Sequence, residues 1–140
     1  DLLGRKVVAN GGAALRLFTR QLRQFASLPG KPYARELLDA VQRLEDVTDW
    51  LLTRAASNPN EIGAASVEYL HLFGYVAYAW LWARMADVAQ SSMDADPPFY
   101  TAKLATARFY FTRLLPRILS LEQSIRAGSE PLFELDAASF

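Results

Sequence analysis

Glu68 and His71 are the residues whose types and spacing come nearest to catalytic or metal chemistry. They lie one helical turn apart, like the Glu and His of a di-iron helical bundle. Such a site requires the same pair on a second helix and a Glu from each of two more, but this sequence holds a single histidine. We therefore predict no metal site. His71 is expected to be a neutral ring at the edge of the core, hydrogen-bonded to a neighbour.

Two other patterns lack the partners that their chemistry needs. Ser66 lies near His71, but no sharp turn, oriented base or oxyanion hole accompanies this hydroxyl. Gly11 and Gly12 precede a helix, but the additional glycines and the preceding strand of a phosphate-binding loop are missing. We interpret the two glycines as the turn that leads into that helix. No catalytic, cofactor-binding or metal-binding residue is predicted in this chain.

Charged residues do not gather into an acid–base pair either. The neighbouring carboxylates at 45–46 and 94–96 fall on a polar helix face and in a loop, where solvation explains them. The segment from Lys103 to Arg117 interleaves cations with aromatic residues, yet its four charges spread around a helical wheel. Most are expected to be solvated or paired. We predict that interdomain or interface contacts come from Lys103, Arg108, Tyr110 and Arg113.

Four helical segments, joined by short loops, must position these side chains. The first is predicted over about 12–28 and the second over 32–56, each with apolar residues at intervals of three and four. Pro32 is placed in the first turn of the second helix. The fourth is predicted to begin at Asp96 and to end at Gly128, a left-handed cap. Pro116 lies inside this helix and should kink it, because it cannot donate a backbone hydrogen bond.

The third helix has the clearest start signal. Asn58, Pro59 and Glu61 fit the N-cap, N1 and N3 positions of a reciprocal capping box, and the helix should run to about Gln90. It is apolar nearly all round, so we expect it to be central and buried, with a partner surface as the open alternative. Its uncharged stretch between Glu68 and Arg84 is shorter than the roughly 20 residues that span a membrane.

No strand-like alternation or hairpin dipeptide appears. The segment 131–140 carries Leu132, Phe133, Leu135 and Phe140, which are too apolar to be left in water, so we expect it to pack on the helices. The predicted fold is all-α: an up-and-down four-helix bundle with a packed C-terminal tail.

Composition narrows the functional classes. Half of the residues are hydrophobic, so a disordered tail is excluded. Fifteen basic and fifteen acidic residues leave no net charge, whereas a nucleic-acid binder usually carries a basic excess. Cysteine is absent, so disulfides and thiolate chemistry are excluded. No signal-peptide pattern is present, and a cytoplasmic protein is expected. Since the sequence begins with Asp1 and not Met, we expect either a processed chain or a piece of a longer protein.

Three segments resemble the C-terminal domain of the large acyl-CoA dehydrogenases, of the 3-methylmercaptopropionyl-CoA dehydrogenase-like type. The most specific is 99–111, FYTAKLATARFYF, followed by Arg113, Leu115 and Pro116. Segments 69–76, YLHLFGYV, and 82–86, WARMA, are similar to the preceding helix of that domain. The opening DLLGRK, with Gly11 and Gly12, is similar to the junction where the domain leaves the catalytic core. Residues 1–10 would then end the linker or last helix of that core, and 11–140 would form the helical-bundle domain.

The resemblance implies a parent enzyme that oxidises an acyl-CoA to the 2-enoyl-CoA with FAD and passes the electrons to an electron-transfer flavoprotein. In that family the catalytic base and the flavin site precede the segment similar to Asp1, so none is carried onto a residue here. The domain is expected to be non-catalytic, to pack on the upstream core and to extend a homodimer interface. Away from that core, the first nine residues are expected to lose their partners and to fray or associate.

Two alternatives remain open from the residues alone. The chain could be an autonomous helical protein-interaction module that offers a groove to a partner. It could also bind an apolar ligand or lie on a membrane surface.

Overall fold

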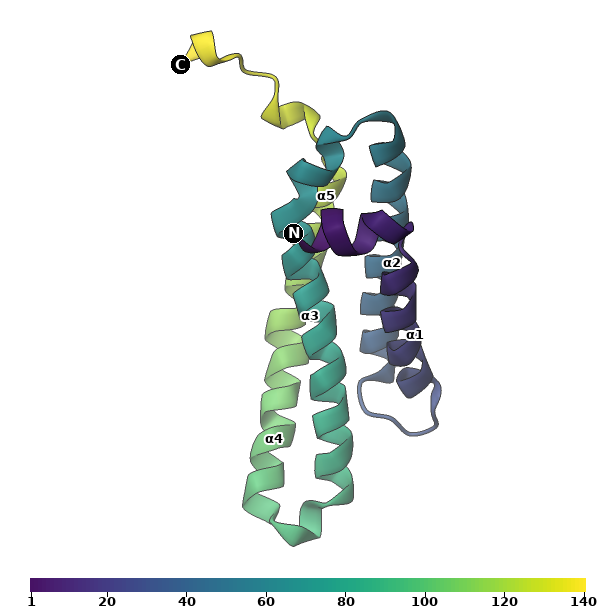
Figure 1. The fold of residues 1–140 in the computed structure, drawn as a ribbon. Coiled ribbons are helices and arrows are strands. Elements are labelled where there is room, and N and C mark those ends of the chain that lie inside the picture. The colour runs from purple at the N-terminus through teal and green to yellow at the C-terminus, as the bar shows by residue number, and fades with distance from the viewer.

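The computed structural model describes residues 1–140 and contains five α-helices and no strand. They are α1 (Ala13–Ser27), α2 (Ala34–Ser57), α3 (Asn60–Ser91), α4 (Pro97–Phe109) and α5 (Ile118–Arg126). The chain runs up and down, and α4 and α5 together form the fourth rod (Figure 1). The long α3 is the central element, because it contacts α2, α4, α5 and the N-terminal segment. The predicted all-α bundle is confirmed.

Pro116 divides the fourth rod, as its position in the sequence predicts. The chain passes from α4 through a π-helical turn, Tyr110–Leu114, and a 3₁₀ turn, Leu115–Arg117, before α5 begins. Because proline has no N–H to donate, the regular hydrogen-bond ladder cannot continue through this position. The kink therefore takes the form of a widened turn followed by a tightened one.

The second helix starts later than predicted, at Ala34. Tyr33 adopts a left-handed backbone conformation with φ of 57°, which ends the loop before the helix can begin. Its ring stacks on Phe111 with the ring centroids 4.0 Å apart. This packing of the side chain explains why a non-glycine residue accepts the strained backbone conformation, and Pro32 consequently stays outside the helix.

The predicted capping box of α3 forms only in part. Asn58 accepts a hydrogen bond from the backbone N–H of Asn60 at 3.1 Å, as a cap should. Glu61 does not return a bond to the backbone of Asn58, whose N–H already donates to Arg54 at 2.9 Å. Instead the Glu61 carboxylate is fully buried and accepts from the Ser129 hydroxyl at 3.0 Å. The reciprocal arrangement was therefore wrong, and Glu61 ties the start of α3 to the end of α5.

The N-terminal residues are held by the bundle itself. Leu3 and Val7 are buried in a π-helical turn, Leu3–Val7, that contacts α1 and α3. Figure 1 shows this segment crossing in front of α3 before the chain turns into α1. Two of the first nine residues therefore have partners inside this domain, which the expectation that the segment frays or associates did not anticipate.

The C-terminal tail, by contrast, was predicted to pack on the helices and does not. Every residue from Glu130 to Phe140 is exposed, and the segment extends away from the helices (Figure 1). Gly128, with φ of 79°, ends α5 next to the polar cluster around Glu61. The tail leaves the bundle at this polar end, where no apolar surface receives its large side chains. The prediction of a packed C-terminal tail was therefore wrong.

Candidate functional site

Glu68 and His71 are not part of a chemical centre. His71 is exposed and has no hydrogen-bond partner, so the expected hydrogen-bonded ring at the core edge was wrong. No three His, Asp or Glu side chains gather anywhere in the molecule in an arrangement that could hold a metal ion. The hydroxyl of Ser66 donates to the carbonyl of Ile62 at 2.7 Å, one turn back on its own helix. It is engaged by the backbone rather than by a base.

Gly11 and Gly12 form the turn that leads into α1, as interpreted from the sequence. Both adopt left-handed conformations, with φ of 57° and 81°. Their N–H groups donate to the carbonyls of Val8 and Val7 at 3.0 and 2.9 Å. A phosphate group needs free N–H donors, and these two are already used.

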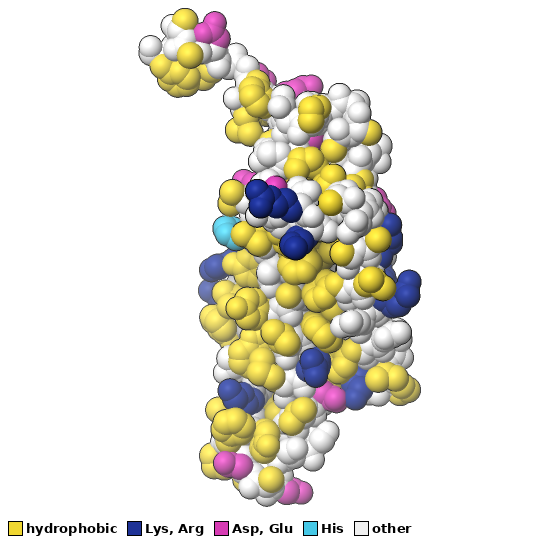
Figure 2. Space-filling view, viewed as in Figure 1, with side chains coloured by type: hydrophobic (Ala, Val, Ile, Leu, Met, Phe, Trp, Pro, Cys, Tyr) yellow, Lys and Arg dark blue, Asp and Glu magenta, His cyan; other side chains and the backbone are white.

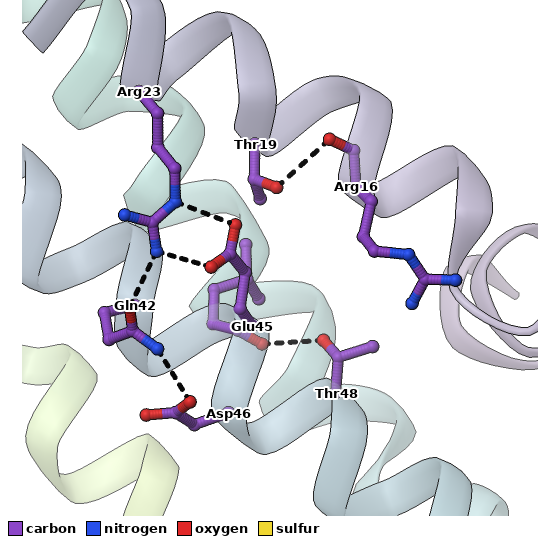
Figure 3. A network of polar contacts seen from close by, with 8 residues as sticks. Arg16, Thr19, Arg23, Gln42, Glu45, Asp46 and Thr48 are labelled. Atoms are coloured by element: carbon purple, nitrogen blue, oxygen red, sulfur yellow. Dashed lines mark hydrogen bonds and ion pairs between the residues drawn. The ribbon is translucent and has the colours of Figure 1, made fainter. Parts of the chain in front are cut away.

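The densest polar network lies between α1 and α2 (Figure 3). Arg23 donates to both carboxylate oxygens of Glu45, and also to the Gln42 side chain at 2.7 Å. Burial opposes ionisation of Glu45, but the hydrogen bonds from Arg23 and Thr19 outweigh it and lower the pKa of this carboxyl. Glu45 is therefore paired and not simply solvated, which corrects the sequence interpretation. The network joins two helices and leaves no free base or nucleophile.

Tyr110 differs from the other predicted interface residues because it is buried, with 4% of its surface exposed. Its hydroxyl donates to the backbone carbonyl of Tyr75 at 2.6 Å. Burial, with Tyr75 and Tyr78 nearby, raises the pKa of this phenol well above its usual value. Tyr110 therefore fixes the kink of the fourth rod against α3, and its side chain is not available at the surface of this domain.

The three cations of the predicted set lie on different sides of the fourth rod, as the helical wheel indicates. Lys103 is half-buried and stands over the ring of Phe99, 5.2 Å from its centroid. Arg108 lines a depression with Pro32 and Tyr33, at the loop between α1 and α2. Arg113 is exposed in the π-helical turn and forms no ion pair. They do not form one binding site.

A groove between α3 and α4 is the apolar surface that the sequence reasoning did not locate. It has a volume of about 500 Å³ and is lined by Leu81, Arg84, Met85, Val88, Phe99, Tyr100 and Lys103. Because α3 is apolar on all sides, its periodicity did not indicate which face would stay exposed. None of the helices is long and apolar enough to cross a membrane.

Comparison with known proteins places this arrangement in a family. The family described as "Acetyl-CoA dehydrogenase C-terminal like" matches residues 18–136. The broad-specificity linear acyl-CoA dehydrogenase FadE5 of Mycobacterium tuberculosis is 28% identical, over 100% of this chain and 26% of its own length. The 3-methylmercaptopropionyl-CoA dehydrogenase of Ruegeria pomeroyi is 31% identical, over 82% of this chain and 21% of its own length. The chain thus spans about a quarter of these relatives, and it belongs to the acyl-CoA dehydrogenase C-terminal family.

Proposed function

We propose that this chain is the non-catalytic C-terminal domain of a FAD-dependent acyl-CoA dehydrogenase. The enzyme would convert an acyl-CoA to the 2-enoyl-CoA and pass electrons to an electron-transfer flavoprotein. The observation that carries the proposal is the family match across residues 18–136, together with two relatives named as acyl-CoA dehydrogenases. Because CoA thioesters are intracellular metabolites, we propose the cytoplasm as the location.

The residues present here do not fit a flavin or a CoA thioester. The N–H groups of the Gly11–Gly12 turn are already hydrogen-bonded, and the α3–α4 groove is an open apolar surface with two cations at its border. We therefore assign FAD, acyl-CoA and the catalytic base to the part of the enzyme outside these residues. No chemical step is routed through this domain.

The role we propose for the domain is to pack on the catalytic core and to extend the homodimer interface. A large apolar contact of this kind restrains the elements around an active site. Lys103, Arg108 and Arg113 would then contact the core or the second subunit, because none of them has an acidic partner within the domain. Since they lie on different sides of the fourth rod, we expect each to contribute separately.

The activity is tested on the full-length protein that contains these residues. We expect a yellow protein that reduces an electron acceptor when acyl-CoA substrates of several chain lengths are added. A well-folded full-length protein without flavin and without this activity on any acyl-CoA would contradict the proposal.

The supporting role is tested by charge removal in the same protein. Arg113→Ala should weaken dimerisation or lower activity, whereas Arg20→Ala, at an exposed and unpaired arginine of α1, is the matched control. Sedimentation measures the dimer, and steady-state kinetics measure the activity. If dimerisation and activity were the same in both variants and in the unmodified enzyme, Arg113 would not be an interface residue.

A further inference from the structure

The part of the molecule formed by residues 79–109, which we call the α3–α4 arm, reverses the usual distribution of side chains. Its five buried residues are all alanine: Ala79, Ala83, Ala86, Ala89 and Ala107. Four of its large apolar residues, Leu81, Val88, Phe99 and Phe109, are exposed, whereas Trp80 and Trp82 are partly buried against the core. A helix pair that folds for its own stability places large side chains inside, where they bury the most apolar area. The arm instead presents four of its large apolar side chains to its surroundings.

The exposed large apolar residues of α3 form one continuous face, which we call the α3 stripe. Its members are 40–62% exposed and return to the same side of the helix: Val67, Leu70, Tyr78, Leu81 and Val88. Gly74 and Met85 fall on the same face between them. Phe99 of α4 continues the apolar surface across the groove. Figure 2 shows hydrophobic side chains gathered along α3 and α4, an exposed patch of the kind that marks an interaction site.

The N-terminus indicates what covers this surface. Residues Leu3–Val7 contact α3, and Figure 1 shows Asp1 lying in front of its N-terminal half. In the relatives, the region that matches this chain is only 26% and 21% of the length. If the catalytic core precedes Asp1, as the proposed function has it, its point of attachment lies beside the N-terminal half of α3.

The charges around the α3 stripe are consistent with a partner that supplies carboxylates. Arg84 stands over the ring of Trp80, 5.0 Å from its centroid, and Lys103 stands over Phe99. Neither cation has an acidic partner in the domain, and no carboxylate lies within the stripe. An apolar centre with unpaired cations at its border has the composition of a protein interface.

We propose that the α3 stripe is the face on which the catalytic core of the same chain docks. This inference rests on the proposed function and specifies which surface of the domain performs the packing. It assigns the apolar contact to Leu70, Tyr78 and Leu81, and the polar border to Arg84 and Lys103.

The direct test is photo-crosslinking in the full-length enzyme, purified from a mixture of isotopically light and heavy subunits. We expect Tyr78→p-benzoylphenylalanine to form links to residues that precede Asp1, and only within one chain. Leu17→p-benzoylphenylalanine, on the outer face of α1, is the control and should give few such links. Links from position 78 to residues of a second copy would show an intersubunit interface and overturn the proposal. Equal linking from positions 78 and 17 would also overturn it.

A paired substitution gives an independent readout. Leu70→Glu with Leu81→Glu places charges on the α3 stripe, and both side chains are exposed, so the helix should still form. Limited proteolysis of the full-length enzyme should then cut near residues 1–12 several-fold faster. Leu17→Glu with Leu119→Glu, at matched exposed leucines on α1 and α5, should leave the rate unchanged. Equal cleavage of both variants, with helicity retained, would contradict the docking of the core on α3.

Failure of this inference is distinct from failure of the proposed function. An enzyme that carries flavin and oxidises acyl-CoA, but shows no protection or linking at the stripe, would retain its function and lose this interface. A colourless and inactive full-length protein would instead overturn the function itself.

Discussion

In α2 the fully buried side chains include Leu37, Leu44 and Leu51, whereas in the α3–α4 arm the buried side chains are alanines. The first region encloses a conventional core with α1, α5 and the first half of α3, which we call the bundle body. The arm lies beside the loop between α1 and α2 at Asp87 and Arg108, and past this loop it continues as two helices only (Figure 1). This difference indicates that the bundle body supplies the stability of the domain, while the arm supplies surface to a partner.

The largest expected loss of stability distinguishes the bundle body from the α3–α4 arm. Leu44→Ala removes a fully buried side chain from the bundle body and should lower the free energy of unfolding by about 2–5 kcal/mol. Leu81→Ala, in the exposed face of the arm, should cost less than about 1 kcal/mol in the isolated residues 1–140. Urea unfolding followed by circular dichroism measures both. Comparable losses would mean that the arm shares the core of the bundle.

A substitution that adds volume tests how closely the two arm helices approach. Ala89 is fully buried on α3, which packs against α4, and Ala89→Leu should cost about 1–3 kcal/mol by overpacking. Replacement of an exposed residue at the same end, Gln90→Leu, provides the control for helix propensity. If Ala89→Leu were neutral or stabilising, the arm would be loosely packed and the contrast with the body would disappear.

Alkaline pH should act on the body through Tyr69. Burial raises the pKa of this phenol to about 12, although its hydrogen bond with Thr48 at 2.8 Å works against the rise. Because the folded state then holds this proton more tightly than the unfolded state, stability is retained below pH of about 10 and falls above it by up to about 1.4 kcal/mol per pH unit.

The matching variant removes the phenol. Tyr69→Phe removes the hydrogen bond to Thr48 and should lower the free energy of unfolding by about 1 kcal/mol at neutral pH. Above pH 10 the stability of this variant should decline less steeply than that of the unmodified domain. Tyr78→Phe, at an exposed ring, is the control. Parallel alkaline unfolding curves for Tyr69→Phe and the unmodified domain would refute this origin of the pH dependence.

The smallest loss of stability is expected at the ion pair that joins the bundle body to the arm. Lys31, in the loop between α1 and α2, pairs with Asp87 of α3 at 2.8 Å. Lys31→Ala should lower stability by about 0.2–1 kcal/mol, and the loss should shrink as salt is added. Lys6→Ala, at an exposed lysine without an acidic partner, should change thermal unfolding less than this. A larger loss would mean that the ion pair holds the arm in place.

Sequence patterns predicted the elements with strong local signals and failed where tertiary context decides. Apolar spacing located α1 and α2, and Pro116 predicted the break in the fourth rod. In α3 the apolar residues surround the helix, so no pattern could show that His71 and Tyr78 face outward. The burial of Glu61 depends on Ser129, which lies far away in sequence. The tail was misjudged because hydrophobicity alone does not provide a surface to receive it.

The positions of the four predicted interface residues on the fourth rod were also only partly predictable from local spacing. The spread of Lys103, Arg108 and Arg113 around the fourth rod followed from their spacing. Tyr110 lies three residues after the buried Ala107 and next to the buried Phe111, so its spacing already placed it beside the buried face. Its hydrogen bond to the carbonyl of Tyr75 is a contact between two helices that spacing alone does not specify.

Hydroxyl-radical footprinting of the full-length enzyme tests the central claim most directly, because it compares leucines of equal chemistry within one molecule. In the domain, Leu70 and Leu81 are 52% and 40% exposed, while Leu17 and Leu119 are 60% and 50% exposed. We predict that Leu70 and Leu81 are oxidised several-fold more slowly than Leu17 and Leu119 in the intact enzyme. Similar oxidation rates at all four leucines would show that the α3 stripe remains in water and would contradict the account.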